Sequence, residues 1–245
     1  MRNVLGCLGI LACLGLAAVG YAQSKGDSGS FGIGVKGSFL GGGVEAAARV
    51  THHTNIRAGF NMFSYSRSFN KDQTTYNGQL SFKTVEAHYD IFPWAGKFHV
   101  SPGVLIYAAT PITATANFSS TNSFTLGGQT YWSDPNAPAT GNGNIKFNQA
   151  APMATFGWGN LVPRKASKHF SFPVELGVAF QGSPKATLNV TGNLCTEQGV
   201  ESSCNPAAST PTIQNNIISE QNKINNSMKF FKAYPIISGG IGYKF

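Results

Sequence analysis

Charged side chains of both signs occur at alternate positions along several apolar stretches of this 245-residue chain. Glu86, His88 and Asp90 are spaced two apart, and His99 follows after a short Pro-Trp-containing segment. A carboxylate close to an imidazole favours its charged form, so such residues can form ion pairs. The complete candidate set is Glu45, Arg49, Arg57, Glu86, His88, Asp90, His99 and Glu175.

Alternation with a period of two predicts that these residues share the polar faces of β-strands. The clearest example sets an apolar series against a polar or small one: Phe170, Phe172, Val174, Leu176, Val178 and Phe180 against Ser171, Glu175, Gly177 and Gln181. Further strands are expected at about 31–40, 44–50, 56–62, 84–91, 99–108, 145–158 and 233–245. Gly41, Gly42 and Gly43 either reverse the chain between the first two or lie within one bent strand. The chain is therefore expected to be all-β.

The connections between these strands alternate in length. Short turns at 51–55, 93–97 and 163–168 alternate with long polar segments at 66–78, 117–144 and 192–228. Short periplasmic turns and long external loops are typical of transmembrane antiparallel up-and-down barrels. We expect about eight strands, with ten as the alternative. The long segments are expected to include a hairpin over 124–132 and a short helix after Pro211, before the last strand.

Aromatic residues gather where this topology places the periplasmic rim, and they predict an aromatic belt at the membrane interface. They are Phe92, Trp94, Phe98, Trp158, Phe170, Phe172, Tyr243 and Phe245. Prolines at 102, 152, 173 and 235 depart from the pattern, since proline cannot donate to a sheet. They predict bulges or strand ends. A soluble barrel would instead place its apolar face inside.

The final stretch carries a family resemblance. Its alternate residues Ile237, Ile241, Tyr243 and Phe245 resemble the closing strand of bacterial outer-membrane barrels. The segments 87–94, 151–159, 177–184 and 234–245 are similar to those of small proteobacterial outer-membrane proteins, in the size class of OmpA and OmpW. The resemblance implies a location in the outer membrane, and recognition of the four terminal residues by the barrel-assembly machinery. It implies no activity.

The amino terminus has the form of a secretory signal peptide, a short basic start followed by an apolar run and small residues. We expect cleavage after Ala22, which divides the chain into a signal peptide at 1–22 and a barrel domain at 23–245. Cys13 offers lipidation as an alternative. In the exported chain Cys195 and Cys204 are expected to form a disulfide.

The overall composition restricts the partners. The formal net charge is +8, but Lys and Arg lie mostly in turns or singly on strands, and an exported protein has little access to nucleic acid. Outer-membrane lipid and lipopolysaccharide are therefore the expected partners, while the sequence names no partner for the external loops. No nucleic acid and no cofactor are expected.

An enzyme is not expected either. The five histidines, at 52, 53, 88, 99 and 169, all fall at or near the proposed periplasmic turns. None lies on an external loop beside a nucleophile. His52 and His53 could bind a metal ion, but the sequence offers no third ligand near them. We therefore predict no catalytic and no metal site.

Function then depends on the lumen, because an eight-stranded barrel is narrow enough to be filled by its own side chains. Buried charges must be paired. We expect an ion-pair plug, in which Asp90 lies opposite His99, His88 opposite Ser101, and Glu86 near Arg49 and Arg57. The chain is then a structural or interaction barrel presenting external loops. The alternative is a narrow channel or transporter for small or hydrophobic solutes.

Overall fold

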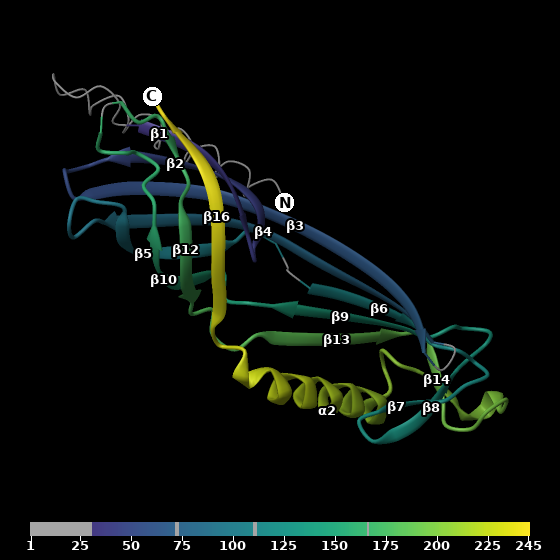
Figure 1. Cartoon of the computed structure of the whole chain (residues 1–245). Helices are drawn as coiled ribbons and strands as arrows, with labels where there is room; N and C mark the ends of the chain where they lie inside the picture. The colour runs from purple at the N-terminus through teal and green to yellow at the C-terminus, as the bar shows by residue number, and fades with distance from the viewer. Residues whose placement is uncertain (1–30, 72–73, 110–111, 166) are drawn as a thin grey trace, which may run out of the picture.

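The computed structural model describes residues 31–71, 74–109, 112–165 and 167–245. The predicted signal peptide and Cys13 lie outside these residues. Eight antiparallel strands close into a barrel (Figure 1). They are β1 (Phe31–Ser38), β2 (Gly41–Arg49), β3 (Thr54–Lys71), β4 (Thr74–Ile91), β5 (Phe98–Tyr107), β10 (Ala150–Trp158), β12 (Val174–Ala179) and β16 (Tyr234–Lys244). The short β11 (Phe170–Ser171) precedes β12 and also pairs with β16.

Pairing between the first and last strands closes the barrel. Val35 lies opposite Ile241, and Lys36 lies opposite Gly240. The barrel has eight strands and not ten. We call one end of the barrel the turn end, because the connections 50–53, 92–97 and 159–169 and the C-terminal Phe245 lie there. The opposite end is the loop end.

The barrel exterior is apolar and its interior is polar. Ile33, Val35 and Leu176 are 45%, 59% and 44% exposed, whereas Glu86 on an inward position is 2% exposed. A soluble barrel would have the opposite arrangement, because its apolar face must be removed from water. The alternation therefore places the predicted apolar series toward lipid.

Two expected connections differ from the structure. The described residues of the segment 66–78 are strand and not loop, because β3 and β4 pair continuously from Thr54–Ile91 to Lys71–Thr74. The first reversal lies at Phe39 and Leu40, one step before the three glycines. Gly41 then begins β2 with φ of 109°, a conformation that glycine adopts without steric cost.

The long hairpin β3–β4 extends beyond the barrel. Each of its strands has 18 residues, about 60 Å of extended chain. Even tilted at about 45° this exceeds a hydrocarbon layer of about 30 Å. The outer half of β4 pairs with β6 (Ile112–Asn117), β6 pairs with β9 (Thr140–Lys146), and β9 pairs with β13 (Lys185–Thr191). We call this sheet, running away from one side of the barrel in Figure 1, the extension.

The helix α2 (Pro211–Ser227) packs along β13, the edge strand of the extension. Pro211 occupies a first-turn position, where its missing N–H costs no helical hydrogen bond. Asn225 Oδ1 accepts from Ala186 N at 2.7 Å, and Gln221 Oε1 accepts from Leu188 N at 3.0 Å. The side-chain amides of the helix thus satisfy backbone groups that an open sheet edge would expose. The predicted helix is confirmed.

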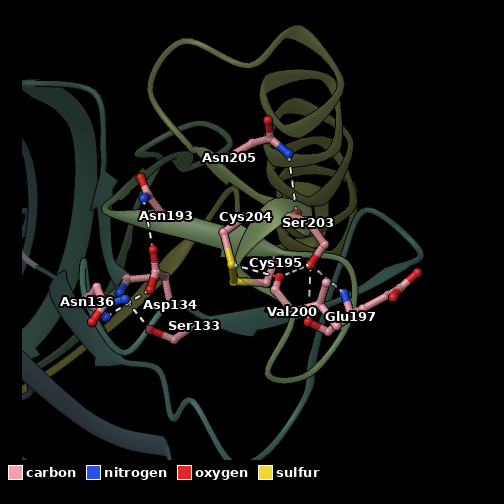
Figure 2. Close-up of a disulfide and its surroundings, with 11 residues drawn as sticks. Ser133, Asp134, Asn136, Asn193, Cys195, Glu197, Val200, Ser203, Cys204 and Asn205 are labelled. Carbon is pink, nitrogen blue, oxygen red and sulfur yellow. Dashed lines mark hydrogen bonds between the residues drawn. A yellow bond between two sulfur atoms is a disulfide. The ribbon is translucent and has the colours of Figure 1, made fainter.

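Short strands complete the loop end. β7 (Phe124–Leu126) and β8 (Gln129–Ser133) form the expected hairpin, and β14 (Asn193–Cys195) pairs with β8 and with β15 (Cys204–Pro206). The predicted disulfide joins Cys195 to Cys204 (Figure 2). The 3₁₀ turn Glu201–Ser203 precedes β15, and the 3₁₀ turn Met228–Phe230 lies between α2 and β16. Within the described residues, no helix is both long and apolar enough to span a membrane.

A buried apolar core joins α2 to the extension. Its members come from the helix, the sheet and the small strands: Leu126, Tyr131, Ala139, Val190, Leu194, Ala207, Ile213 and Ile217.

Among the four prolines that depart from the pattern, only Pro173 marks a strand break, between β11 and β12. Pro102, Pro152 and Pro235 lie within β5, β10 and β16.

Candidate functional site

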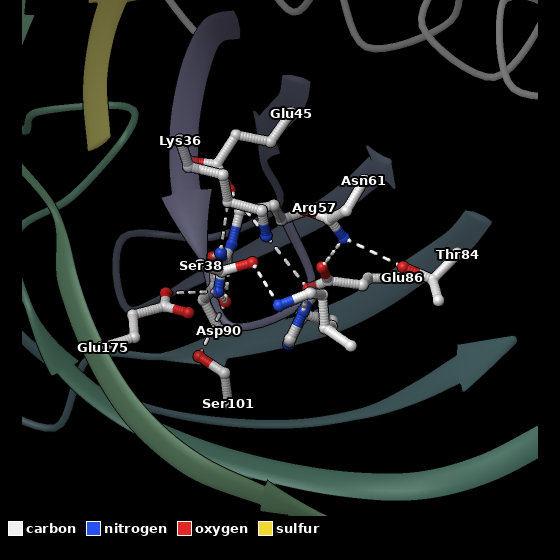
Figure 3. A network of polar contacts seen from close by, with 12 residues as sticks. Lys36, Ser38, Glu45, Arg57, Asn61, Thr84, Glu86, Asp90, Ser101 and Glu175 are labelled. Carbon is white, nitrogen blue, oxygen red and sulfur yellow. Dashed lines mark hydrogen bonds and ion pairs between the residues drawn. The ribbon is translucent and has the colours of Figure 1, made fainter. Parts of the chain in front are cut away.

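The turn-end half of the barrel lumen holds a cluster of charged side chains (Figure 3). Each member occupies an inward position of its strand, because the outward positions are apolar. We call this set the charge cluster; it comprises Lys36, Glu45, Arg57, Glu86, His88, Asp90, His99 and Glu175, all buried.

Arg57 lies at the centre of the charge cluster. Its Nη1 donates to Glu45 Oε2 at 3.1 Å, and its Nη2 donates to Asp90 Oδ1 at 3.0 Å. Glu175 contacts the same guanidinium. One arginine therefore joins carboxylates from three strands, which its fork of five N–H donors makes possible.

Lys36 is the second basic residue that forms ion pairs in the cluster. Its Nζ lies 3.0 Å from Glu86 Oε2 and 3.5 Å from Glu45 Oε2. Glu86 also contacts His88 Nε2 at 2.9 Å and accepts from Asn61 Nδ2. Buried carboxylates at this density would be unstable alone, so the ion pairs with Lys36 and Arg57 and the hydrogen-bond contacts with the two imidazoles stabilise them.

Seven of the eight predicted lumen residues meet in this cluster. The eighth, Arg49, lies closer to the turn end, where its Nη2 donates to Pro163 O at 3.2 Å. Lys36 was missing from the prediction, together with the neutral partners Asn61 and Thr84, whereas Ser101 was expected in the lumen but opposite His88. The signal was present, since Lys36 falls on the polar positions of the segment that places Ile33 and Val35 outward.

The predicted register of the Asp90–His99 pair is wrong, although the two side chains lie close enough to interact electrostatically. His88 lies opposite Gly103, and Ile91 lies opposite Val100, two residues from the expected register. Asp90 instead accepts from Ser101 Oγ at 2.7 Å, and His99 Nε2 contacts Glu175 Oε1 at 2.9 Å. The connection between β4 and β5 begins at Phe92, one residue earlier than expected. A shift of two preserves which side chains face inward, so the faces are correct while the pairs are not.

The predicted partner of Glu86 is also different. Arg57 contacts Glu45, Asp90 and Glu175, and Glu86 pairs with Lys36 and His88. Lys36 reaches Glu86 across the barrel from β1, a contact that neighbouring-strand arguments do not reveal.

The connection after β10 closes the turn end from inside. Leu161 and Val162 are 4% and 0% exposed. Asn160 Oδ1 accepts from Asn55 Nδ2 at 3.0 Å and from Val162 N at 2.9 Å, which anchors this connection to β3. A Cβ at Gly34 would lie 2.8 Å from a methyl of Leu161. Inward glycine on β1 therefore provides the space for the insertion.

The loop-end half of the lumen is apolar, which corrects the expectation of a polar lumen along its whole length. Inward side chains from most strands pack there into one cluster: Leu40, Phe82, Leu105, Tyr107, Ala151, Met153, Ala179 and Ile236. The charge cluster thus lies between this apolar layer and the Leu161 insertion. A cavity of only about 10 Å³ lies within the charge cluster, near Arg57, Asp90 and Phe92. That is about the volume that a single water molecule needs.

Most of the predicted aromatic belt faces outward. Trp94, Trp158 and Phe172 are 76%, 61% and 67% exposed. Phe92 is the exception at 1% exposure, because its ring closes the turn end of the lumen beneath the guanidinium of Arg164, with Cζ 4.9 Å from the ring centroid. The terminal residues Ile237, Ile241, Tyr243 and Phe245 face outward, and their role in assembly stays a prediction.

The histidines outside the lumen lie at the turn end. His52 and His53 occupy the turn between β2 and β3, and His169 Nδ1 lies 3.0 Å from Lys244 O. Within the described part of the chain, no three His, Cys, Asp or Glu side chains are grouped so that they could hold a metal ion.

Comparisons with known proteins agree with this architecture. No family model and no curated protein matches the chain. Among solved structures, CarO2 of Acinetobacter baumannii is 19% identical over 90% of this chain and 100% of its own, with a TM-score of 0.51. CarO of the same organism is 20% identical over 87% and 97%, with a TM-score of 0.49. CarO2 is an eight-stranded outer-membrane barrel. The chain has the fold of a small bacterial outer-membrane β-barrel protein.

Proposed function

We propose that the protein is an outer-membrane scaffold whose barrel is closed to solutes and which holds the extension and α2 outside the membrane. The observation that carries this proposal is the filling of the lumen in three successive layers. These layers are the Leu161 insertion, the charge cluster and the apolar cluster around Leu105.

The chemistry of the charge cluster supports a structural role. An open polar conduit would leave ionisable groups in contact with water, whereas Glu86, Arg57 and Glu175 are 2%, 6% and 4% exposed. Their polar atoms bind one another across the barrel. Removing one member leaves an uncompensated buried charge, so the intact cluster holds the strands in one arrangement.

The proposed role includes interaction at the loop end and no catalytic step. The extension, α2 and the small sheet of β7, β8, β14 and β15 form a folded unit with its own core. This unit is suited to contact a partner, and lipopolysaccharide is one of the partners that we propose. The outward residues Ile237, Ile241, Tyr243 and Phe245 support recognition by the assembly machinery. We further propose that residues 1–22 direct export and are removed.

A second candidate is binding of a small apolar solute at the loop end. A groove of about 550 Å³ lies between α2 and the extension, and Phe124, Ile145 and Leu188 are among its lining residues. This volume is within the range of small-molecule sites, about 300–1,000 Å³. The closed lumen opposes passage of such a solute along the barrel axis.

Solute flux into proteoliposomes tests the proposal. Vesicles containing the refolded protein are expected to swell in a small sugar no faster than vesicles without it, because the lumen is filled. A general porin in parallel vesicles gives the positive control. Rapid swelling by the folded protein, verified by its heat-modifiable gel migration, would favour the transport alternative.

A further inference from the structure

A pocket of about 390 Å³ lies at the turn end, outside the lumen and next to the connection after β10. Lys97, Arg164, Lys165 and Lys168 line it, and the three lysines are exposed. Among its described lining residues there is no Asp or Glu. The pocket therefore has a concentrated positive charge that favours an anion.

Arg164 adds a partly buried positive charge to the same pocket. Its Nη1 donates to Thr51 O at 3.3 Å, while its Nε and Nη2 are buried without a hydrogen-bond partner among the described residues. Burial, and then the nearby Arg49, lower the pKa of Arg164 to about 10. The guanidinium is still charged at neutral pH, and a nearby anion would relieve the repulsion from Arg49.

The other wall of the pocket is apolar and continues the lipid-facing surface. Trp158, Phe170 and Phe172 are 61%, 65% and 67% exposed, and all three line the pocket. Aromatic rings at this position lie at the headgroup level of a bilayer, and lysine ammonium groups are drawn to the same depth. A ligand that fits both walls has an anionic headgroup and apolar chains.

We propose that this pocket is a specific site for an anionic phospholipid of the adjacent membrane leaflet. Its phosphate lies among Lys97, Lys165 and Lys168, and its acyl chains run along Trp158, Phe170 and Phe172. The proposal is independent of whether the lumen conducts, because the pocket lies outside it.

Titration of the detergent-solubilised barrel with phosphatidylglycerol, read by native mass spectrometry, tests the site. We expect one lipid to be retained by the wild-type protein. The variant Lys165→Gln/Lys168→Gln is expected to bind it about twenty-five-fold more weakly, since each basic group beside an anionic headgroup contributes about a fivefold factor. Heat-modifiable migration verifies that each variant is folded.

The matched control is Lys146→Gln/Lys185→Gln, which removes the same charge from exposed lysines of the extension. It is expected to bind phosphatidylglycerol as the wild type does. Equal weakening of both variants would overturn the proposal, because the attraction would then be diffuse.

Two further titrations distinguish the source of the anion. Glycerol phosphate has the same phosphate without chains, and we expect it not to displace the lipid at equal concentration. Phe170→Ala/Phe172→Ala is expected to weaken the lipid as well. If glycerol phosphate displaces the lipid fully, or if the aromatic variant binds normally, the pocket is an anion site and the lipid proposal is wrong.

Discussion

The barrel and the extension place their apolar residues on opposite sides, although β3 and β4 run through both. In the barrel, Ile33 and Leu176 face outward, while Arg57 and Glu86 are buried. In the extension, Val190 and Ile217 are buried between sheet and helix. β3 and β4 thus pass from a region whose apolar side chains face outward into a region whose apolar side chains are buried. The difference indicates where the membrane ends, and it predicts different responses of the two regions to mutation.

The largest expected effect is on the barrel, from Arg57→Ala. The substitution leaves Glu45, Asp90 and Glu175 without their shared cation, and removing one partner of a buried ion pair costs about 3–5 kcal/mol. We expect a lower urea midpoint of barrel unfolding, followed by heat-modifiable migration. Arg67→Ala, on the exposed outer part of β3, is the control and is expected to be near neutral. Equal midpoints for the two variants would contradict the structural role of the cluster.

A smaller effect is expected in the extension, from Ile217→Ala. Removing this side chain from the core under α2 leaves a cavity, and such changes cost about 2–5 kcal/mol. Hydrogen exchange of β13 is expected to accelerate while barrel unfolding stays unchanged. The matched variant Ile241→Ala, on the lipid-facing side of β16, is expected to leave exchange in β13 as it is. Destabilisation of the barrel by Ile217→Ala would show that the two regions are one cooperative unit.

Loss of the disulfide is expected to act on the small sheet of β7, β8, β14 and β15 and not on the barrel. Cys195 and Cys204 are separated by 9 positions, and a bond closing so short a loop contributes about 2–3 kcal/mol. The variant Cys195→Ser/Cys204→Ser is expected to be cleaved faster by limited proteolysis near β14 and β15, with normal barrel migration. Mass analysis of the wild type is expected to find no free thiol at these positions, and two free thiols would contradict the disulfide.

The smallest effect concerns pH and the carboxylate of Asp134 at the loop end. This group accepts from Asn136 N at 2.8 Å and from Asn193 Nδ2 at 3.0 Å, which lowers its pKa. A lowered pKa in the folded state gives stabilisation that is present above the unfolded value, near 3.9 for aspartate, and lost as the pH falls further. Local exchange around β8 is expected to rise below about pH 4, and the Asp134→Asn variant is expected to lack this rise. A rise of the same size in the variant would exclude Asp134 as its origin.

The sequence predicts faces better than it predicts pairs. Alternation places Glu86, His88 and Asp90 inside, because side-chain direction has a strict period of two. Register is a separate quantity, and a slip of two residues places Ser101 instead of His99 opposite Asp90 without changing any face. The contact between Lys36 and Glu86 crosses the barrel, so it depends on closure and on side-chain length rather than on neighbouring strands.

The extension and the Leu161 insertion were harder to predict. The segment 66–78 is mostly polar in sequence, with Phe69 and Tyr76 as the exceptions, so alternation loses its signal there. Leu161 belongs to a connection without any period. Its place depends on inward glycines such as Gly34, and these have meaning only once β1 and β16 lie side by side. The predicted helix succeeded because Pro211 and the spacing of Ile213 and Ile217 are local signals.

The most direct test of the closed lumen is single-channel recording in planar bilayers, comparing the wild type with Glu86→Ala. The account predicts no stable conductance steps for the wild type. It also predicts none for the variant, whose unfolding midpoint falls because Lys36 and His88 lose their carboxylate. Steady ion-selective steps in the wild type, or steps opened by Glu86→Ala in a barrel that stays folded, would contradict it and identify a gated pore.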